Sequence, residues 1–298
     1  MTDLVFDREF AITPGRAEVL SPLVRRVVAN NPSAFTFRGT SSFIVGRGEV
    51  AVIDPGPADD AHLAALLEAV RGETVSHILI THTHADHSPL AAALQKATGA
   101  KTFGYGPVPA PAGGEALRLD ASIDHAFQPD VRLADGDTIA GRGWTLDGVF
   151  TPGHMSNHMC FALREERALF SGDHVMAWAT SVIAPPDGDM AQYFASLGKL
   201  LERDDQVYHP GHGPSRPNPL PLVRGYLAHR RMREEAIRSS VDKGARSVAD
   251  VVATVYAGLD STLHGAASLS ARAHLDHLVE QGRLRKSGGV YEPVPGNR

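Results

Sequence analysis

The chain has 298 residues, of which 43% are hydrophobic and 21% charged, with 29 Gly and 20 Pro. This composition excludes collagen-like, coiled-coil and largely disordered chains, and it predicts one large globular domain or a core domain with a small appendage. The apolar runs are far shorter than the roughly 20 residues of a membrane-spanning helix, so no membrane contact is expected.

The N-terminal residues and the cysteine content bear on the compartment. Residues 1–10 carry several charges and no apolar core, unlike a secretory signal. A single cysteine, Cys160, excludes an internal disulfide, as is typical of reducing compartments. Both observations predict a cytoplasmic location.

Charge is distributed unevenly along the chain, whose formal net charge is −5 at pH 7. Residues 1–215 hold 16 Lys and Arg against 26 Asp and Glu, whereas residues 216–298 hold 13 against 8. A basic end region of this kind either meets an anionic substrate or nucleic acid, or forms a solvated helix face. The solvated face is the favoured interpretation.

Short apolar runs alternate with helical stretches, which predicts a layered α/β or α+β domain. Strands are expected at residues 34–37, 42–45, 50–53, 77–80, 144–150, 159–163, 168–170 and 206–208. Helices are expected at residues 60–71, 89–98, 190–203 and 221–240.

Four of these strands run directly into segments that carry histidine or aspartate. The segments are Thr81-His82, Thr151-Pro152-Gly153-His154, Ser171-Gly172-Asp173 and His209-Pro210-Gly211-His212. Strand ends and the loops after them hold ligands in layered folds, so a site is expected where these strands end.

The densest chemical signal lies just after residues 77–80, where His82, His84, Asp86 and His87 fall within six residues. Packing does not explain such a cluster. His82 and His84 can share one ion, while Asp86 and His87 on the following turn face a second. Imidazole and carboxylate donors without a thiolate suit zinc, with manganese or iron(II) as competitors.

Three further residues complete a ligand set for two divalent ions. His154, Asp173 and His212 each follow a glycine, which lets the backbone approach closely. Together with the four clustered residues they make seven candidate metal ligands.

The pattern H-x-H-x-D-H followed by separate His, Asp and His resembles the metallo-β-lactamase superfamily, over residues 35–212. Asp54 is similar to the family's early aspartate that supports the ligands from behind. The resemblance implies an α+β fold, the αββα sandwich of two mixed sheets with metals at their shared edge. It also implies one ion on His82, His84 and His154, a second on Asp86, His87 and His212, and Asp173 bridging both.

This ligand set predicts a dinuclear metal-dependent hydrolase that uses a metal-bridging hydroxide. Two ions, two carboxylates and a hydroxide leave a charge of about +1, which favours a transition state that is an oxyanion. The ions lower the pKa of a shared water and polarise the attacked oxygen. Asp86 is the expected catalytic residue, placed to orient the hydroxide.

After residue 243 the sequence changes character. A capping box begins at Ser247, a helix is expected at residues 269–281, and Ser287-Gly288-Gly289 indicates a hairpin. This outline is a winged-helix module at residues 244–298, appended to a catalytic domain at residues 1–243. Its second helix has one arginine, Arg272, so we expect a packing or homodimer element that does not read sequence in duplex DNA.

Within the superfamily, the chain resembles the glyoxalase II-like branch and its lactamase-like protein 2 subgroup, which carries such a C-terminal segment. Asp173 sets it apart from three-histidine β-lactamases, and the spacing from Asp173 to His212 leaves no room for the insertion of mRNA-processing nucleases. The expected substrate is a small ester or thioester. A phosphodiesterase or single-stranded endoribonuclease, a one-iron persulfide dioxygenase, and a binding protein with a structural metal stay open.

Overall fold

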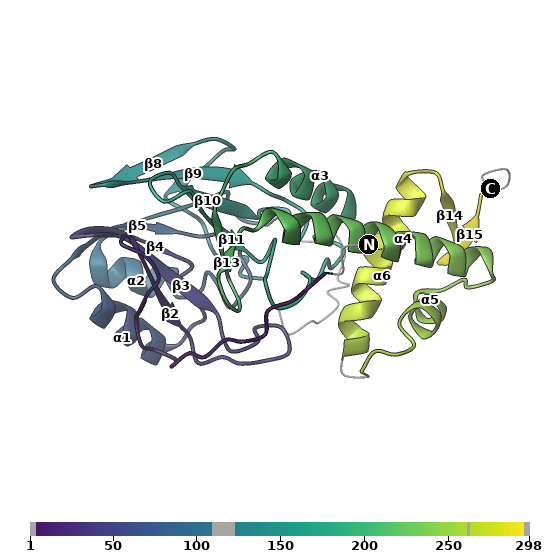
Figure 1. The fold of residues 1–298 in the computed structure, drawn as a ribbon, viewed down its shortest axis with the longest axis horizontal. Helices are drawn as coiled ribbons and strands as arrows, with labels where there is room; N and C mark the ends of the chain where they lie inside the picture. The colour runs from purple at the N-terminus through teal and green to yellow at the C-terminus, as the bar shows by residue number, and fades with distance from the viewer. Residues whose placement is uncertain (1–3, 109–122, 261–262, 295–298) are drawn as a thin grey trace.

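The structure is a computed structural model that describes residues 4–108, 123–260 and 263–294. In these residues the strands form two mixed sheets that lie face to face, with helices on both outer faces and a small helical module at one end (Figure 1). This is the expected αββα sandwich with a winged-helix appendage. Among the described helices, none is long and apolar enough to cross a membrane.

The first sheet has the strand order β1-β2-β3-β4-β5-β6-β7. Its strands are antiparallel from β1 to β4 and parallel from β4 to β7. They span Glu18–Val19, Val24–Val28, Ser41–Arg47, Glu49–Ile53, Thr74–Leu79, Lys101–Gly104 and Val131–Arg132.

The second sheet has the order β13-β12-β11-β10-β9-β8, with one parallel pair, β11 and β12. Its strands in chain order are Thr138–Gly141, Trp144–Phe150, Met159–Leu163, Ala168–Gly172, Val207–Pro210 and Arg216–Pro217. Every residue of β10 and β11 is buried, because one face of this sheet meets the first sheet and the other is covered by helices.

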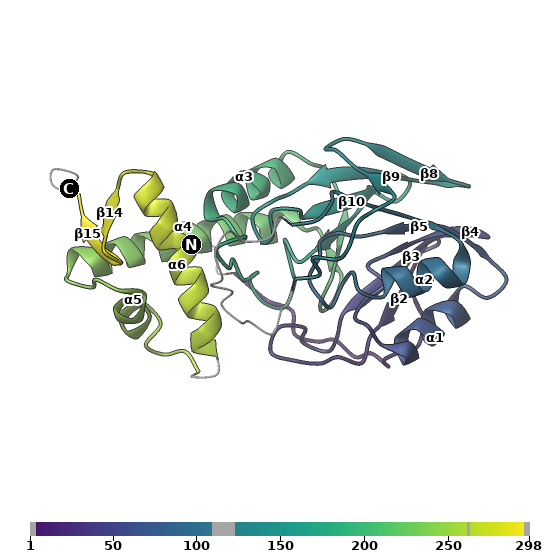
Figure 2. The same cartoon turned by 180° about the vertical axis from the view of Figure 1, so that it is seen from behind.

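Two helices cover each outer face (Figures 1 and 2). On the first sheet lie α1 (Asp60–Ala69) and α2 (Ala91–Thr98), and on the second α3 (Met190–Leu201) and α4 (Leu220–Asp242). Asp59 and Asp189 cap α1 and α3 by accepting backbone N–H groups, which explains where these helices begin.

Three apolar layers hold the sandwich together. Phe43, Trp144 and Phe170 belong to the layer between the two sheets. Leu66 of α1 and Leu94 of α2 pack on the outer face of the first sheet, whereas the helices α3 and α4 pack on that of the second. The layers leave the ends of the strands free to carry polar side chains.

One predicted strand is wrong, and six observed strands were not predicted, namely β1, β2, β6, β7, β8 and β13. Residues 34–37 form a turn, because Ser33 Oγ accepts the N–H groups of Phe35 and Thr36 and Phe37 takes a positive φ of 57°. Strand β2 was missed because Arg25 and Arg26 interrupt its apolar pattern. Both arginines are paired, with Glu73 and Glu18 at 2.6 Å.

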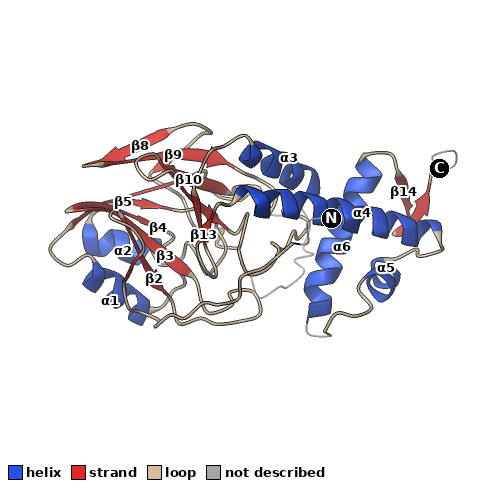
Figure 3. Cartoon of the chain, in the orientation of Figure 1, coloured by secondary structure: helices blue, strands red, loops and turns tan. Residues whose placement is uncertain are grey.

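The C-terminal module consists of α5 (Val248–Val255), α6 (His264–Glu280) and the hairpin β14 (Leu284–Ser287) and β15 (Val290–Pro293), seen to one side in Figure 3. The capping box at Ser247 is present. Ile237 and Val241, at the end of α4, belong to the module's core. The long helix α4 therefore joins both parts, and the boundary after residue 243 stays a prediction.

A buried carboxylate fastens α6 to α4. Glu234 accepts hydrogen bonds from Nδ1 of His274 at 3.2 Å and of His277 at 2.7 Å. Burial alone would raise the pKa of Glu234, but these two hydrogen bonds lower it from 4.5 to about 2. The hydrogen bond to Glu234 raises the pKa of His277.

We expect Glu234→Gln to lower the free energy of unfolding at pH 7 by about 1–3 kcal/mol, because it weakens the hydrogen bonds from both His274 and His277. The Glu234 contribution is complete above pH 4.5 and is lost as the pH falls toward 2; that of His277 is complete below pH 6.5 and is lost as the pH rises through its raised pKa. Urea unfolding across pH checks this. Exposed Glu235→Gln is the control, and equal effects of the two variants would contradict the assignment.

Candidate metal centre

All seven predicted ligands converge at one end of the sandwich. The segment after β5 supplies four of them, and the segments after β9, β11 and β12 supply one each. The carboxylate of Asp173 lies between two groups of side chains. The seven residues are His82, His84, Asp86, His87, His154, Asp173 and His212.

The first group contains His82, His84, His154 and Asp173, whose donor atoms lie within 4.8 Å of one another. Nδ1 of His84 is 3.0 Å from Nε2 of His82 and 3.1 Å from Nε2 of His154. Nε2 of His154 is 3.8 Å from an oxygen of Asp173. Three imidazole nitrogens and a carboxylate oxygen therefore face a common point.

Hydrogen bonds to residues outside this group determine which ring nitrogen of His82 and of His154 carries the hydrogen. Thr81 Oγ1 donates its hydrogen to Asp54 at 2.6 Å, so it accepts from Nδ1 of His82 at 2.9 Å. Nδ1 of His154 donates to the carbonyl of Val182 at 2.7 Å. Both Nε2 atoms consequently carry lone pairs that point at Nδ1 of His84, an arrangement that fits a cation between them.

The second group contains Asp86, His87 and His212. Nε2 of His212 is 3.2 Å from Asp86 Oδ2, and Nε2 of His87 is 3.4 Å from the same oxygen. Nδ1 of His87 donates to Asp54 at 2.8 Å, which leaves Nε2 facing the group. Nε2 of His87 is buried and has no hydrogen-bond partner in the described part of the chain, as expected of an atom that binds an ion.

Asp173 reaches both groups. Its Oδ1 is 3.5 Å from Nε2 of His87, and its Oδ2 is 3.3 Å from Nε2 of His212 and 3.8 Å from that of His154. Gly211 allows this approach, since a Cβ there would lie 2.6 Å from Asp173 Oδ1. The geometry suits a bridging carboxylate; that the seven residues bind ions stays a prediction.

The electrostatics differ between the groups. Burial lowers the pKa of His82 well below its usual value and, together with the adjacent His154, that of His84 to about 3, so these rings are neutral and able to bind a metal. Burial would also lower the pKa of His87 and His212. There, however, Asp86 and Asp173 raise that of His87 well above its usual value, and chiefly Asp173 raises that of His212 to about 9.

Asp54, directly after β4, supports the segment that carries the first four predicted ligands, residues 81–88, called the ligand segment below. Besides His87, its carboxylate accepts the backbone N–H of Thr81 at 2.7 Å and the Thr81 hydroxyl. It holds a positive φ of 50°, an unusual conformation for a side-chain-bearing residue and one that is concentrated at functional sites. Its oxygens are thus occupied by donors rather than aimed at an ion.

Several supporting contacts were not predicted from the sequence. Thr40 Oγ1 donates to Asp86 Oδ2 at 3.1 Å, and the carbonyl of Gly39 accepts from Nδ1 of His212 at 3.3 Å. A Cβ at Gly39 would lie 2.0 Å from a backbone oxygen, so glycine is required there. Thr40 has no motif around it that would have marked it.

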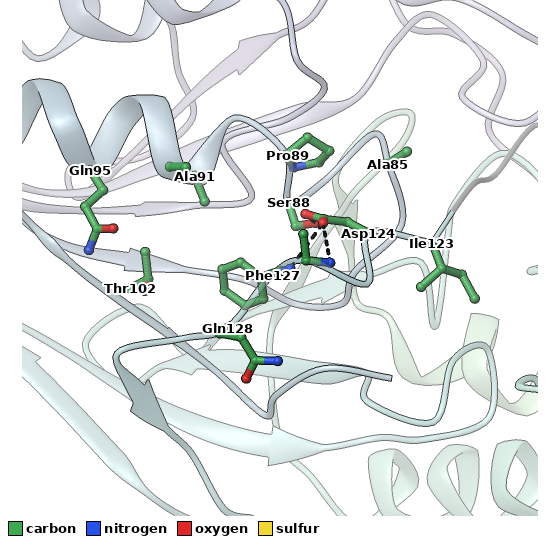
Figure 4. A pocket seen from close by; sticks show the side chains of 12 residues that line it. Ala85, Ser88, Pro89, Ala91, Gln95, Thr102, Ile123, Asp124, Phe127 and Gln128 are labelled. Carbon is green, nitrogen blue, oxygen red and sulfur yellow. Dashed lines mark hydrogen bonds between the residues drawn. The ribbon is translucent and has the colours of Figure 1, made fainter. Parts of the chain in front are cut away.

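A separate cavity of about 440 Å³ lies on the outer side of the ligand segment, beside the start of α2 (Figure 4). Ser88 donates to Asp124 at 2.8 Å across it, and Phe127 forms part of its wall. Among the described residues that line it, none is a predicted ligand. The Ser88 contact joins the end of the ligand segment to the segment that precedes β7.

Replacing Asp54 with alanine should weaken metal binding roughly 10- to 100-fold, because partners that orient ligands typically contribute this much. Zinc dissociation constants from chelator competition measure the effect. Asp59→Ala, which removes only the cap of α1, should leave them unchanged. An Asp54→Ala variant that binds zinc as tightly as the parent would refute the supporting role.

Comparison with protein families gives two matches. Residues 35–212 match the model described as "Metallo-beta-lactamase superfamily", and residues 247–291 match "Beta-lactamase associated winged helix domain". The first match spans every predicted ligand, and the second lies within the C-terminal module.

Named relatives span most of the chain. The beta-lactamase-like protein 2 homolog of Drosophila melanogaster is 30% identical over 305 residues, covering 95% of this chain and 99% of that protein. An atrochrysone carboxyl ACP thioesterase of Paecilomyces divaricatus is 31% identical over 260 residues, covering 83% and 74%. The crystal structure of a metallo-beta-lactamase family protein from Thermus thermophilus superposes with a TM-score of 0.76 at 21% identity, covering 93% and 100%, which supports the fold.

Proposed function

Because the chain belongs to the metallo-beta-lactamase superfamily and is a metal-dependent hydrolase, we propose that it hydrolyses thioesters with two divalent ions held by the seven predicted ligands. The observation that carries the proposal is the position of Asp173 between two sets of donors. Imidazole and carboxylate ligands without a thiolate favour zinc.

The choice of a thioester rests on the relatives. Several of them are named atrochrysone carboxyl ACP thioesterase, at 28–31% identity. An acyl thioester carbonyl becomes an oxyanion when water attacks it, and a site with two cations stabilises that charge. When bound, the ions polarise the attacked carbonyl and acidify water.

Asp86 is the proposed catalytic residue among the chain's own groups. Its side chain is 20% exposed, against 2% for His212 and 0% for His87, so it lies nearest the solvent in its group. Its Oδ2 faces His212 and accepts from Thr40, which fixes the carboxylate. The other oxygen, Oδ1, would accept a hydrogen bond from the attacking water and orient it.

The basic region of α4 gives little support to the ribonuclease alternative. Arg230 is buried, Arg233 donates to the carbonyl of Val255, and Arg238 pairs with Glu235 and Asp242. Arg224 and Arg231 stay exposed on the same helix, so the fold leaves a smaller basic face for phosphate contacts than the sequence indicates. Such contacts would have made RNA binding strongly salt-dependent.

A hydrolysis panel tests the proposal. Zinc-loaded protein is assayed on an acyl-N-acetylcysteamine thioester, a lactone and a single-stranded RNA, with Asp86→Asn as the inactive control. We expect the thioester to give the highest kcat/KM, and Asp86→Asn to lose that activity while still folding. RNA cleavage that depends on Asp86, without thioester hydrolysis, would overturn the proposal in favour of the nuclease.

A further inference from the structure

The segment after β11 contacts two predicted ligands from outside the metal centre. Ser181 Oγ donates to the backbone carbonyl of Asp173, and the carbonyl of Val182 accepts from Nδ1 of His154 at 2.7 Å. The Ser181-Val182 dipeptide thus determines where the ring of His154 points. A side chain that fixes the position of this dipeptide therefore also fixes the orientation of the His154 ring.

Arg230 of α4 holds the dipeptide. Its guanidinium donates to the carbonyl of Ser181 and lies over the ring of Tyr193, 5.4 Å from the ring centroid. Tyr193 in turn donates to the carbonyl of His174 at 2.7 Å, directly after Asp173. Tyr193 of α3 and Arg230 of α4 therefore hold the backbone of the segment after β11 at two points, the carbonyls of His174 and Ser181.

The cost of burying Arg230 indicates that its contacts serve more than packing. It is 3% exposed, and its Nε has no hydrogen-bond partner among the described residues. A buried charge with incomplete hydrogen bonding is unfavourable, and an apolar side chain of similar volume would avoid that cost. The cation remains where its donors reach the backbone that orients His154.

We propose that Arg230 is a positioning residue for His154, which acts through Ser181 and Val182 to keep Nε2 of His154 directed at the first group of ligands. The proposal rests on the metal-dependent function proposed above. It assigns to α4 a role in the metal centre, although α4 supplies no predicted ligand.

The test is a zinc-binding cycle on the full-length protein. Zinc dissociation constants are measured by chelator competition for the parent, Arg230→Met, His154→Ala and the double variant. Arg230→Met should weaken zinc binding about 10- to 100-fold, the usual range for a partner that orients a ligand. In the His154→Ala background the same change should have almost no further effect, because the residue it positions is gone.

Arg233→Met is the matched control. Arg233 also lies on α4, donates to a backbone carbonyl, that of Val255, and stacks on a tyrosine at 4.3 Å, but in the C-terminal module. It should leave both zinc constants unchanged. Arg230→Lys keeps a cation near Ser181 and should restore part of the lost affinity; if Arg230→Met does not fold, Arg230→Lys replaces it in the cycle.

Each outcome decides the proposal. Losses for Arg230→Met and His154→Ala that simply add, or unchanged zinc constants in both Arg230 variants, would overturn it. Two tight zinc sites in the parent without thioester hydrolysis would defeat the proposed substrate and leave the Arg230 assignment standing. A parent that binds no zinc would defeat the metal-dependent proposal itself, and the Arg230 assignment with it.

Discussion

Replacing Asp173 with alanine should abolish measurable hydrolysis and weaken the binding of both ions. Asp173 is the side chain whose oxygens lie 3.3–3.8 Å from nitrogens of both ligand groups. Its loss should therefore exceed the roughly 10- to 100-fold effect expected for Asp54→Ala, which acts on ligands from behind. Asp173→Asn keeps the shape of the side chain but lacks its charge. Its loss of activity should lie between those of Asp54→Ala and Asp173→Ala.

The Asp173 variants should keep their fold. The backbone N–H of Asp173 donates to His158 and its carbonyl accepts from Ser181, and neither bond needs the side chain. Circular dichroism and the unfolding midpoint of the metal-free proteins check this point. Equal losses of activity for Asp173→Ala and Asp54→Ala would contradict the bridging assignment.

Removing the ions should lower the thermal midpoint of the parent by roughly 10 °C. A ligand that binds only the folded state at 1,000 times its Kd stabilises it by about 4 kcal/mol, and each kcal/mol shifts the midpoint of a chain this large by about 2–4 °C. Nε2 of His87 and Oδ1 of Asp173 are buried and have no hydrogen-bond partner among the described residues, so bound ions would satisfy them.

Calorimetry before and after chelation, with zinc restored as a second control, measures this shift. In Asp173→Ala the shift on chelation should nearly vanish, because little metal is bound to begin with. If complete metal removal leaves the thermal midpoint of the parent unchanged, the metal centre does not stabilise the fold.

That these seven side chains meet could be predicted because most of the information is local. His82, His84, Asp86 and His87 lie on one short segment, and His154, Asp173 and His212 follow strands of one sheet whose ends meet at the same edge. A dense motif after one strand and single residues after later strands thus indicate that these side chains meet, even when the fold is not known in detail.

Among the supporting residues, Asp54 was predicted from the family resemblance, whereas Thr40 and Arg230 could not be, because their contacts depend on tertiary packing. Thr40 lies 46 residues before Asp86, and Arg230 lies 49 residues after Ser181. In the sequence, Arg230 is one basic residue of a charged helix, whereas in the fold it is buried and donates to the carbonyl of Ser181. The turn at residues 34–37 was misjudged for the same reason, since the bonds of Ser33 outweigh the apolar pattern.

The C-terminal module combines both cases. Its capping box and its Gly288-Gly289 turn are local signals, and both are present. That His274 and His277 face Glu234 of α4 could not be read from the sequence. These contacts turn a polar part of α6 toward the catalytic part, in keeping with a packing element; the absence of duplex DNA reading and the homodimer stay predictions.

The most direct test of the account is the metal content of the zinc-loaded parent, measured by elemental analysis with a crystal structure of the same sample. We expect two ions per chain, one on His82, His84 and His154, one on Asp86, His87 and His212, with Asp173 bound to both. One ion per chain, with Asp86 and His212 free of metal, would contradict it.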